Sequence, residues 1–310
     1  MMQPFLYRDL RYTTLLLVVS VAMAFAPDAY LPMLARAFML PISLTLLLIS
    51  GLARWKKYRW TSITALFGAV LTSGQAFTPV LQMSNKSAGP SIHVFHMNVL
   101  QPNHRFDEAI KQALDSGADV ISVQEVGEDW ADALRTGLCG TYPFAQVIPG
   151  ARYHGIALFS KHPFTQVRTM DLVGTPVIEA LFEVECEPIR LITVHATSPV
   201  SYDHFRQRNE QFETLAQHLV SSDTATIVVG DLNTVPWDKA YQRFCHRTGL
   251  CSTTPLQQRT WPSIGPLAFI PLDHVLISNG LSIRSLTTVH VPGSDHRGLL
   301  AEIQLPFHAR

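Results

Sequence analysis

Residues 224–236 read TATIVVGDLNTVP, and residues 293–299 read GSDHRGL. In the first stretch a β-branched apolar run, typical of a buried strand, ends at the polar turn Gly230–Asn233. In the second stretch Asp295 and His296 directly precede another apolar run. Both stretches therefore place carboxylate, amide or imidazole groups at one end of a predicted strand, where catalytic groups are commonly displayed.

The same pattern of short apolar runs continues on both sides of these two stretches. Many strands with few, well-spaced helices indicate packed sheets flanked by helices. Strands are predicted at 92–98, 118–126, 155–160, 177–185, 189–196, 224–233, 272–278, 281–291 and 297–305, and helices at 105–115, 129–136 and 203–220.

Polar side chains at six of these strand ends form the candidate site. Each has a structural explanation when taken alone: Asn98 as a turn cap, Glu125 as a terminal acid, His195 as a core histidine. A hydrophobic core does not call for the whole set. The candidates are Asn98, Glu125, His195, Asp231, Asn233, Asp273, Asp295 and His296.

This set suits metal-assisted hydrolysis of a phosphate ester. Mg²⁺ (or Mn²⁺) prefers oxygen ligands, and Asn98, Glu125 and Asp295 are the predicted metal ligands. No cysteine and histidine cluster with zinc spacing occurs in the sequence. Asp231 is predicted to orient or deprotonate the attacking water, and Asn233 to hold the phosphate.

The two candidate histidines are predicted to contact phosphate oxygens from opposite sides. Near neutral pH an imidazole can either donate or accept a hydrogen bond, which suits His195 and the catalytic histidine, His296. Asp273 is predicted to hold His296 in the required tautomer. Glu179 is a candidate carboxylate partner for His195, with a solvent-facing strand position as the alternative.

The ordered motifs HMNVL, VQEV, GIALFSKHP, VHATSP, VGDLNTVP, LDHVLIS and GSDHRGL resemble the motif set of the endonuclease/exonuclease/phosphatase superfamily, whose fold is DNase-I-like. The resemblance covers residues 92–305 and implies an α/β fold, a four-layer α/β sandwich with the site at the top of two facing sheets. The resemblance implies a metal-binding pair in Asn98 and Glu125 and a phosphate contact in His195. It implies a nucleophile-orienting pair in Asp231 and Asn233, and a catalytic His296 that Asp273 supports beside the metal-proximal Asp295. All motif positions are present, which argues against an inactive descendant.

Residues 1–83 form a separate, membrane-like region. Apolar segments lie at 12–26, 34–53 and 60–81, and a spanning helix needs about 20 mostly apolar residues. We expect about three transmembrane helices in an anchor at 1–83, a linker at 84–90 and the catalytic domain at 91–310. A cleaved signal peptide and a buried helical hairpin are the alternatives, and the succession of three apolar segments favours the anchor. Together with residues 260–278 this arrangement resembles a bacterial membrane-anchored branch of the superfamily.

Positive charges predict the orientation of this anchor. Arg8 and Arg11 precede the first segment, and RWKKYR at 54–59 separates the second from the third. Positively charged loops stay cytoplasmic, so a multi-pass inner-membrane protein with a periplasmic catalytic domain is predicted. Arg36, near the outer end of the second segment, is predicted to snorkel to the interface.

Charge also bears on the substrate. Of 24 basic and 24 acidic residues, seven basic and two acidic lie in 1–83, which leaves 17 basic and 22 acidic residues. A net charge of −5 on the remainder does not favour tight binding of duplex DNA. The predicted partners are a phosphate-ester substrate (nucleic acid or a lipid head group) and the lipid bilayer, and no protein partner is evident.

Four function classes remain open at this point: a nuclease, a lipid head-group phosphodiesterase, a small-molecule phosphatase and a non-catalytic membrane scaffold. The scaffold predicts loss of Glu125, Asp231 or His296, all of which are present. Residues 261–269 are predicted to form a substrate wall, with a loop packed over the sheet as the alternative. Cys245 and Cys251 are candidates for a disulfide, with free thiols as the alternative.

Overall fold

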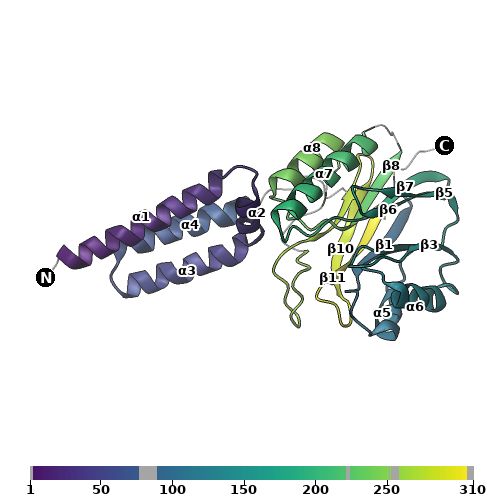
Figure 1. Ribbon diagram of the computed structural model, residues 1–310, viewed down its shortest axis with the longest axis horizontal. Coiled ribbons are helices and arrows are strands. Elements are labelled where there is room, and N and C mark those ends of the chain that lie inside the picture. The colour runs from purple at the N-terminus through teal and green to yellow at the C-terminus, as the bar shows by residue number, and fades with distance from the viewer. Residues whose placement is uncertain (1–2, 77–88, 221–223, 251, 253–257, 306–310) are drawn as a thin grey trace. The chain divides into compact units, whose positions relative to one another are not determined.

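The described strands, all of which lie after residue 90, form two separate sheets (Figure 1). The strands are β1 Ser91–Asn98, β2 Val120–Gln124, β3 Phe144–Ile148, β4 Ile156–Ser160, β5 Phe164–Asp171, β6 Pro176–Val184, β7 Glu187–His195, β8 Ala225–Asp231, β9 Asp273–Ile277, β10 Ser282–His290 and β11 Arg297–Gln304. One sheet has six strands in the order β10-β11-β1-β2-β4-β3, and the other has five in the order β5-β6-β7-β8-β9.

This computed structural model describes residues 3–76, 89–220, 224–250, 252 and 258–305. The chain divides into two units, Met1–Pro79 with Val235–Lys239, and Val80–Thr234 with Ala240–Arg310. Most of the predicted linker at 84–90 lies outside the described residues, as does Cys251, so the predicted disulfide stays untested.

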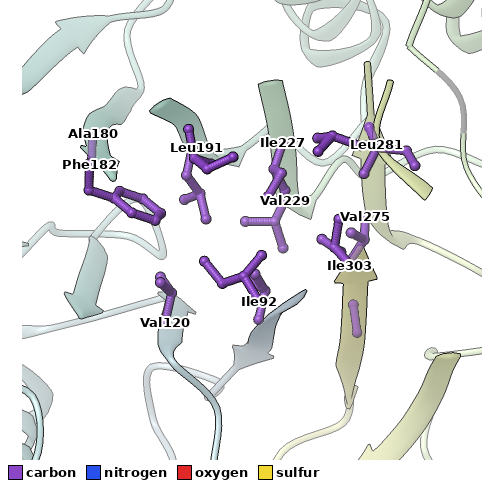
Figure 2. Close-up of a cluster of buried hydrophobic side chains, with 14 of the residues drawn as sticks. Ile92, Val120, Ala180, Phe182, Leu191, Ile227, Val229, Val275, Leu281 and Ile303 are labelled. Carbon is purple, nitrogen blue, oxygen red and sulfur yellow. The ribbon is translucent and has the colours of Figure 1, made fainter. Parts of the chain in front are cut away.

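The two sheets pack face to face through an apolar core. Alternation along each strand sends one set of side chains inward, such as Val94 on β1 and Val229 on β8. Figure 2 shows Ile92 and Val120 from one sheet opposite Leu191, Ile227 and Val229 from the other.

Helices cover the outer face of each sheet. α5 (Phe106–Asp115) and α6 (Glu128–Leu138) pack on the six-stranded sheet, against side chains such as Phe95 and Met97. α7 (Tyr202–Leu219) and α8 (Lys239–Thr248) pack on the five-stranded sheet. The central strands, such as β2, β4, β8 and β9, are therefore buried on both faces, which explains their nearly continuous apolar runs. This order of layers matches the predicted four-layer α/β sandwich.

The predicted strands and helices of this region are confirmed, and three further elements were not predicted. β3 and β5 lie at sheet edges, and β5 is largely exposed, so neither has the apolar run of a central strand. α8 is short and mostly polar, and buries only a few side chains, including Ala240, Tyr241 and Phe244. A sequence pattern reports burial, so elements with little burial escape it.

Residues 3–76 of the N-terminal unit form four helices. They are α1 Gln3–Phe25, α2 Tyr30–Ala37, α3 Met39–Trp55 and α4 Arg59–Ala76. The prediction of a helical region is confirmed, but the continuous helix predicted at 34–53 is wrong, because the chain breaks between α2 and α3. Pro41 supplies a physical reason, since its ring clashes with the carbonyl of a preceding helical turn and favours a new helix start.

Contacts fix the directions of three helices within this unit. The Asp9 carboxylate on α1 accepts the N–H of Thr61 at 2.8 Å, so α1 and α4 begin at the same end. Ser43 donates to the carbonyl of Ala69 and Ser50 to that of Ser62, so α3 runs antiparallel to α4. In the described residues no single helix meets the length and hydropathy expected of a membrane span, and one pair bent by 102°, Pro4–Phe25 with Tyr30–Ala37, meets them jointly.

Arg36 does not snorkel outward as predicted. It is buried, and its guanidinium donates to the carbonyls of Ala26 and Pro27. These carbonyls follow the end of α1, where backbone acceptors lack intrahelical partners. Arg36 therefore stabilises the break between α1 and α2.

Truncation of a core side chain between the sheets tests this fold. We expect Leu191→Ala to lower the free energy of unfolding by about 2–5 kcal/mol, because Leu191 is fully buried and the change leaves a cavity. Val167→Ala, at a half-exposed position on the edge strand β5, should change it by only about 0.5 kcal/mol. Urea unfolding of the full chain in detergent measures both, and equal losses would contradict the assigned core.

Candidate active site

Strand register in the five-stranded sheet brings three candidate residues together. His195, the last residue of β7, pairs with Asp231, the last residue of β8. Asp231 in turn pairs with Asp273, the first residue of the antiparallel strand β9. Neighbouring strands lie about 5 Å apart, so these three groups stand in a row at one edge of the sheet.

The six-stranded sheet adds two more groups opposite this row. Asn98 ends β1 and Glu125 directly follows β2, its parallel neighbour. The Asn98 side-chain amide lies 2.9 Å from Glu125 Oε1 and 3.2 Å from Asp231 Oδ2. One amide group thus joins carboxylates from both sheets.

Glu125 has a strained backbone, with a φ of 64° in the left-handed region. Non-glycine residues rarely adopt this conformation, and it recurs at functional sites. The Gln101 N–H holds Glu125 Oε2 at 3.1 Å. Burial raises the pKa of Glu125, while His195 and the Asn98 amide oppose that rise.

Asp273 and His296 form a close pair. Asp273 Oδ2 lies 2.8 Å from His296 Nδ1, and His296 Nε2 lies 3.6 Å from Asp231 Oδ2. Burial alone would lower the pKa of His296, but the carboxylates of Asp273 and Asp231 outweigh it and raise that pKa to about 10. Burial would raise the pKa of Asp273, but His296 and His96 hold it well below its usual range. His296 is therefore an imidazolium at neutral pH that faces Asp231.

Asp231 lies at the centre of the site. Burial, reinforced by the neighbouring charge of Asp273, raises the pKa of Asp231 to about 6. Its Oδ1 accepts the N–H of Asn233 at 2.9 Å. With this pKa the buried carboxylate of Asp231 is ionised at neutral pH and can accept a proton.

Asn233 and His195 lie side by side next to Asp231. The Asn233 amide donates to the Ala196 carbonyl at 2.9 Å and lies 3.4 Å from His195 Nε2. His195 Nε2 is 3.8 Å from Asp231 Oδ2. Burial lowers the pKa of His195 to about 4, so this imidazole is neutral.

Asp295 faces the loop at 261–269. Its Oδ2 accepts the indole N–H of Trp261 at 2.9 Å, and its carbonyl accepts the N–H of Ser263 at 2.7 Å. Isolated bridges Trp261↔Ile270 and Ile264↔Leu267 close this loop into a small hairpin. The loop is thus attached to a predicted site residue, and its role as a substrate wall stays a prediction.

The residues present fit a hard divalent cation. Oxygen atoms of Glu125 and Asp231 converge on one amide in a buried place, and Asp295 Oδ1 is buried with no partner among the described residues. Asp231, Asp273 and His296 also offer ligand atoms within 4.8 Å of one another. Because Asp273 already binds His296, the oxygens of Asp231, Glu125 and Asp295 suit Mg²⁺ or Mn²⁺ better.

The structure thus brings seven of the eight candidates into one connected group and places Asp295 beside Trp261. The prediction missed His96, whose Nε2 lies 2.6 Å from Asp273 Oδ1, and Ser294, which donates to the Asn98 carbonyl and accepts the His296 N–H. His96 lies two residues before Asn98 and so shares its side of β1, which is the signal that was available.

Glu179 is not a partner of His195, and it is not exposed to solvent. It is buried on β6, where its carboxylate contacts Arg168 at 2.8 Å, Arg190 at 3.1 Å and His218 at 2.5 Å. Glu179 faces α7, whereas His195 faces the space between the sheets. Glu179 pairs with Ile192 on β7, three residues before His195, so period-two alternation puts the two side chains on opposite faces of the sheet.

Comparison with known proteins agrees with this geometry. A model of the Endonuclease/Exonuclease/phosphatase family matches residues 93–296. No curated protein sequence gives a significant match.

Several solved structures share the fold. An endonuclease/exonuclease/phosphatase from Bacteroides vulgatus aligns with a TM-score of 0.59 at 14% identity, covering 70% of this chain and 99% of that one. Sphingomyelinase C from Streptomyces griseocarneus aligns with a TM-score of 0.53 at 18% identity, covering 69% and 99%. D. rerio TDP2 complexed with single strand DNA product aligns with a TM-score of 0.59 at 13% identity, covering 69% and 99%.

The Glu179 cluster predicts a pH-dependent stability. Burial would raise the pKa of Glu179, but bonds from His218 and Arg190 outweigh it and lower that pKa below 4.5. The stabilisation is therefore present above pH 4.5 and is lost as the pH falls through the lowered value. We expect Glu179→Gln to cost about 3–5 kcal/mol at pH 7, because it leaves Arg190 buried and uncompensated, and less in acid.

Urea unfolding at several pH values between pH 3 and pH 7 measures how the stability cost of Glu179→Gln changes as Glu179 becomes protonated. Glu183→Gln, an exposed change on the same strand, is the matched control and should have little effect. A loss for Glu179→Gln that stays constant over this pH range would contradict the assigned cluster.

Proposed function

From the premise that this chain belongs to the endonuclease/exonuclease/phosphatase family, and is a metal-dependent hydrolase of phosphate esters, we propose a membrane-anchored phosphodiesterase. The observation that carries the chemistry is the convergence of Glu125 and Asp231 on the Asn98 amide, with His296 3.6 Å from Asp231. No other group of buried ionisable side chains among the described residues combines carboxylates, amides and imidazoles in this way.

Asp231 orients the attacking water and accepts its proton. Its raised pKa makes it a stronger base than an exposed carboxylate, and Asn233 fixes its other oxygen. His296, an imidazolium held by Asp273, donates a hydrogen bond to a phosphate oxygen from Nε2. A bound Mg²⁺ or Mn²⁺, held by Glu125 and Asp295 with Asn98 nearby, would neutralise phosphate charge and stabilise the leaving oxygen.

His195 and Asn233 complete the phosphate site in this proposal. The Asn233 amide is 3.4 Å from His195 Nε2, so the two side chains reach the same place. His195 is neutral and adds no charge, because burial lowers its pKa to about 4. Both groups therefore serve as hydrogen-bonding partners that orient the ester.

Exposed apolar side chains of the N-terminal unit support the anchor. Leu15, Val18, Leu48 and Val70 are each about 60–70% exposed, and they lie on α1, α3 and α4. Helices with so large an apolar surface are unusual in water, and a bilayer covers such a surface. The alternating directions of α1, α3 and α4 agree with three passes.

Charged and aromatic residues support the orientation. Tyr58 stacks on Phe5 at 4.6 Å, so the start of α1 and the connection between α3 and α4 lie at one end of the bundle. That end carries Arg8, Arg11, Arg54, Lys56, Lys57 and Arg59 together with Trp55 and Trp60. Aromatic residues mark a membrane interface on either side, and basic residues mark the cytoplasmic one. An odd number of passes then puts the catalytic unit on the periplasmic side of the inner membrane.

A lipid head group is the substrate class that one observation favours. The hairpin attached to Asp295 exposes Ile264 (62%), Leu267 (57%) and Phe269 (36%). Apolar side chains at the rim of a phosphoesterase site suit an ester that carries acyl chains. The similar structures include a sphingomyelinase and a protein in complex with single-stranded DNA product. Nucleic acid is therefore the first alternative substrate, and a small phosphate ester is the second.

The first test of this proposal is turnover by the full chain in detergent. We expect Mg²⁺-dependent hydrolysis that a chelator abolishes and that falls about 10²–10³-fold in Glu125→Gln and in His296→Ala. Substrates are sphingomyelin and phosphatidylcholine in mixed micelles, single-stranded and plasmid DNA, RNA and a chromogenic phosphodiester. Preference for the phospholipids supports the lipid assignment, and preference for DNA or RNA overturns it.

Matched controls separate the site from general damage. Glu128→Gln on α6 and His290→Ala on β10 change exposed residues of the same types and should retain activity. Full activity of purified Glu125→Gln or His296→Ala would contradict the assigned site.

Thiol labelling tests the orientation. A membrane-impermeant maleimide should label Cys186, an exposed thiol in the catalytic unit, in spheroplasts that remain intact. Lys57→Cys, in a chain whose natural cysteines are replaced by serine, should be labelled only after lysis. Labelling of Lys57→Cys in intact spheroplasts, or release of the chain by alkaline carbonate, would contradict the anchored topology.

A further inference from the structure

The inward-facing side of β1 changes character along its length. Ile92 and Val94 belong to the core between the sheets, His96 follows, and Asn98 lies in the site. His96 has no exposed surface. A polar ring at the boundary between the core and the site needs a specific partner, because burial of an unpaired polar group is costly.

The partner of His96 is Asp273. His96 Nε2 lies 2.6 Å from Asp273 Oδ1. An ionised carboxylate only accepts hydrogen bonds, so the imidazole carries its hydrogen on Nε2 and donates it. His96 Nδ1 is buried with no partner among the described residues, so within them the bond to Asp273 is the one hydrogen bond that this ring makes.

Asp273 is thereby fixed from both sides. Its Oδ1 binds His96 and its Oδ2 binds His296 at 2.8 Å. A carboxylate with a single partner can rotate about its bond to Cβ, whereas two rigid rings on opposite oxygens remove that freedom. The direction of His296 therefore depends on a residue that does not itself reach the site.

We propose that His96 is a positioning residue, which acts through Asp273 to aim His296 at the reacting phosphate. The expected change in kcat rests on the proposed function. The expected change in the orientation of His296 rests on the two hydrogen bonds of Asp273. A purely structural role would require only a side chain of suitable volume, and leucine would meet it. The positioning role requires a donor at the place of Nε2.

Three substitutions in the full chain distinguish these roles. His96→Leu keeps the volume and removes the donor, and we expect kcat to fall about 10–100-fold with little change in KM. His96→Gln places an amide N–H near the former Nε2 and should recover most of kcat. His96→Asn is too short to reach Asp273 and should behave like His96→Leu.

Phe95→Leu is the matched control for stability. Phe95 is the adjacent buried residue of β1, but its side chain packs against the helices on the other side of the sheet. It should lower the melting temperature without lowering the kcat of the folded protein. If His96→Leu does not fold, the comparison of His96→Gln with His96→Asn decides, and equal kcat values for these two overturn the proposal.

A double mutant tests the route through His296. In an His296→Ala background, His96→Leu should cause no further loss, because residues that act as one unit are not additive. A further loss of kcat of about 10–100-fold, as large as that caused by His96→Leu alone, would mean that His96 acts by another route.

A readout without activity separates this proposal from the proposed function. The N–H resonance of His296 bonded to Asp273 should be present in the ¹⁵N-histidine spectrum of the wild type and be lost or strongly shifted in His96→Leu, while Phe95→Leu retains it. If the wild type turns over no phosphate ester but shows this change, the proposed function fails and the positioning role holds. An unchanged resonance in a folded His96→Leu protein overturns the positioning role.

Discussion

The structure of the site depends on how two adjacent buried carboxylates are compensated. Register places Asp231 opposite Asp273 on neighbouring strands, and both are almost completely buried. Like charges so close in a region of low dielectric constant are unfavourable unless other groups balance them. His296 lies between the two carboxylates and carries the balancing charge. The remaining donors come from the opposite sheet and from the turns after the strands.

This compensation links the site to the stacking of the sheets. The Asn98 amide of the six-stranded sheet contacts Asp231 of the five-stranded sheet. The strands β1 and β8, which end at these residues, must therefore end at the same level. Below the site, Gln124 donates to Ser122 and Thr193, which lie on opposite sheets. A hydrogen-bonded polar layer therefore lies between the apolar core and the catalytic groups. The strained backbone of Glu125 occurs where hydrogen bonds from Asn98 and Gln101 hold its carboxylate.

Much of this arrangement could be predicted from the sequence because it follows from strand alternation and strand ends. Asp231, Asp273 and Asn98 each stand where an apolar run meets a turn, and such positions are visible without a structure. His96 was missed because one polar residue inside an apolar run looks like an ordinary interruption. Only the register across the two sheets reveals that it faces Asp273.

Other errors have the same origin. The side of the sheet that Glu179 faces depends on β6 pairing and on α7, neither of which a single motif reports. Arg36 seemed suited to the interface by its charge, but the break between α1 and α2 gives it backbone partners. Short-range patterns predicted most of the helices and strands, whereas partners distant in sequence decided the roles of these side chains.

The central claim is that Glu125 and Asp295 hold one divalent cation beside Asp231. Titration of the metal-free full chain with Mn²⁺, followed by electron paramagnetic resonance, tests it most directly. The claim predicts saturable binding that is lost in both Glu125→Gln and Asp295→Asn, while Glu128→Gln binds as the wild type does. Wild-type affinity in a folded Glu125→Gln or Asp295→Asn protein would contradict it.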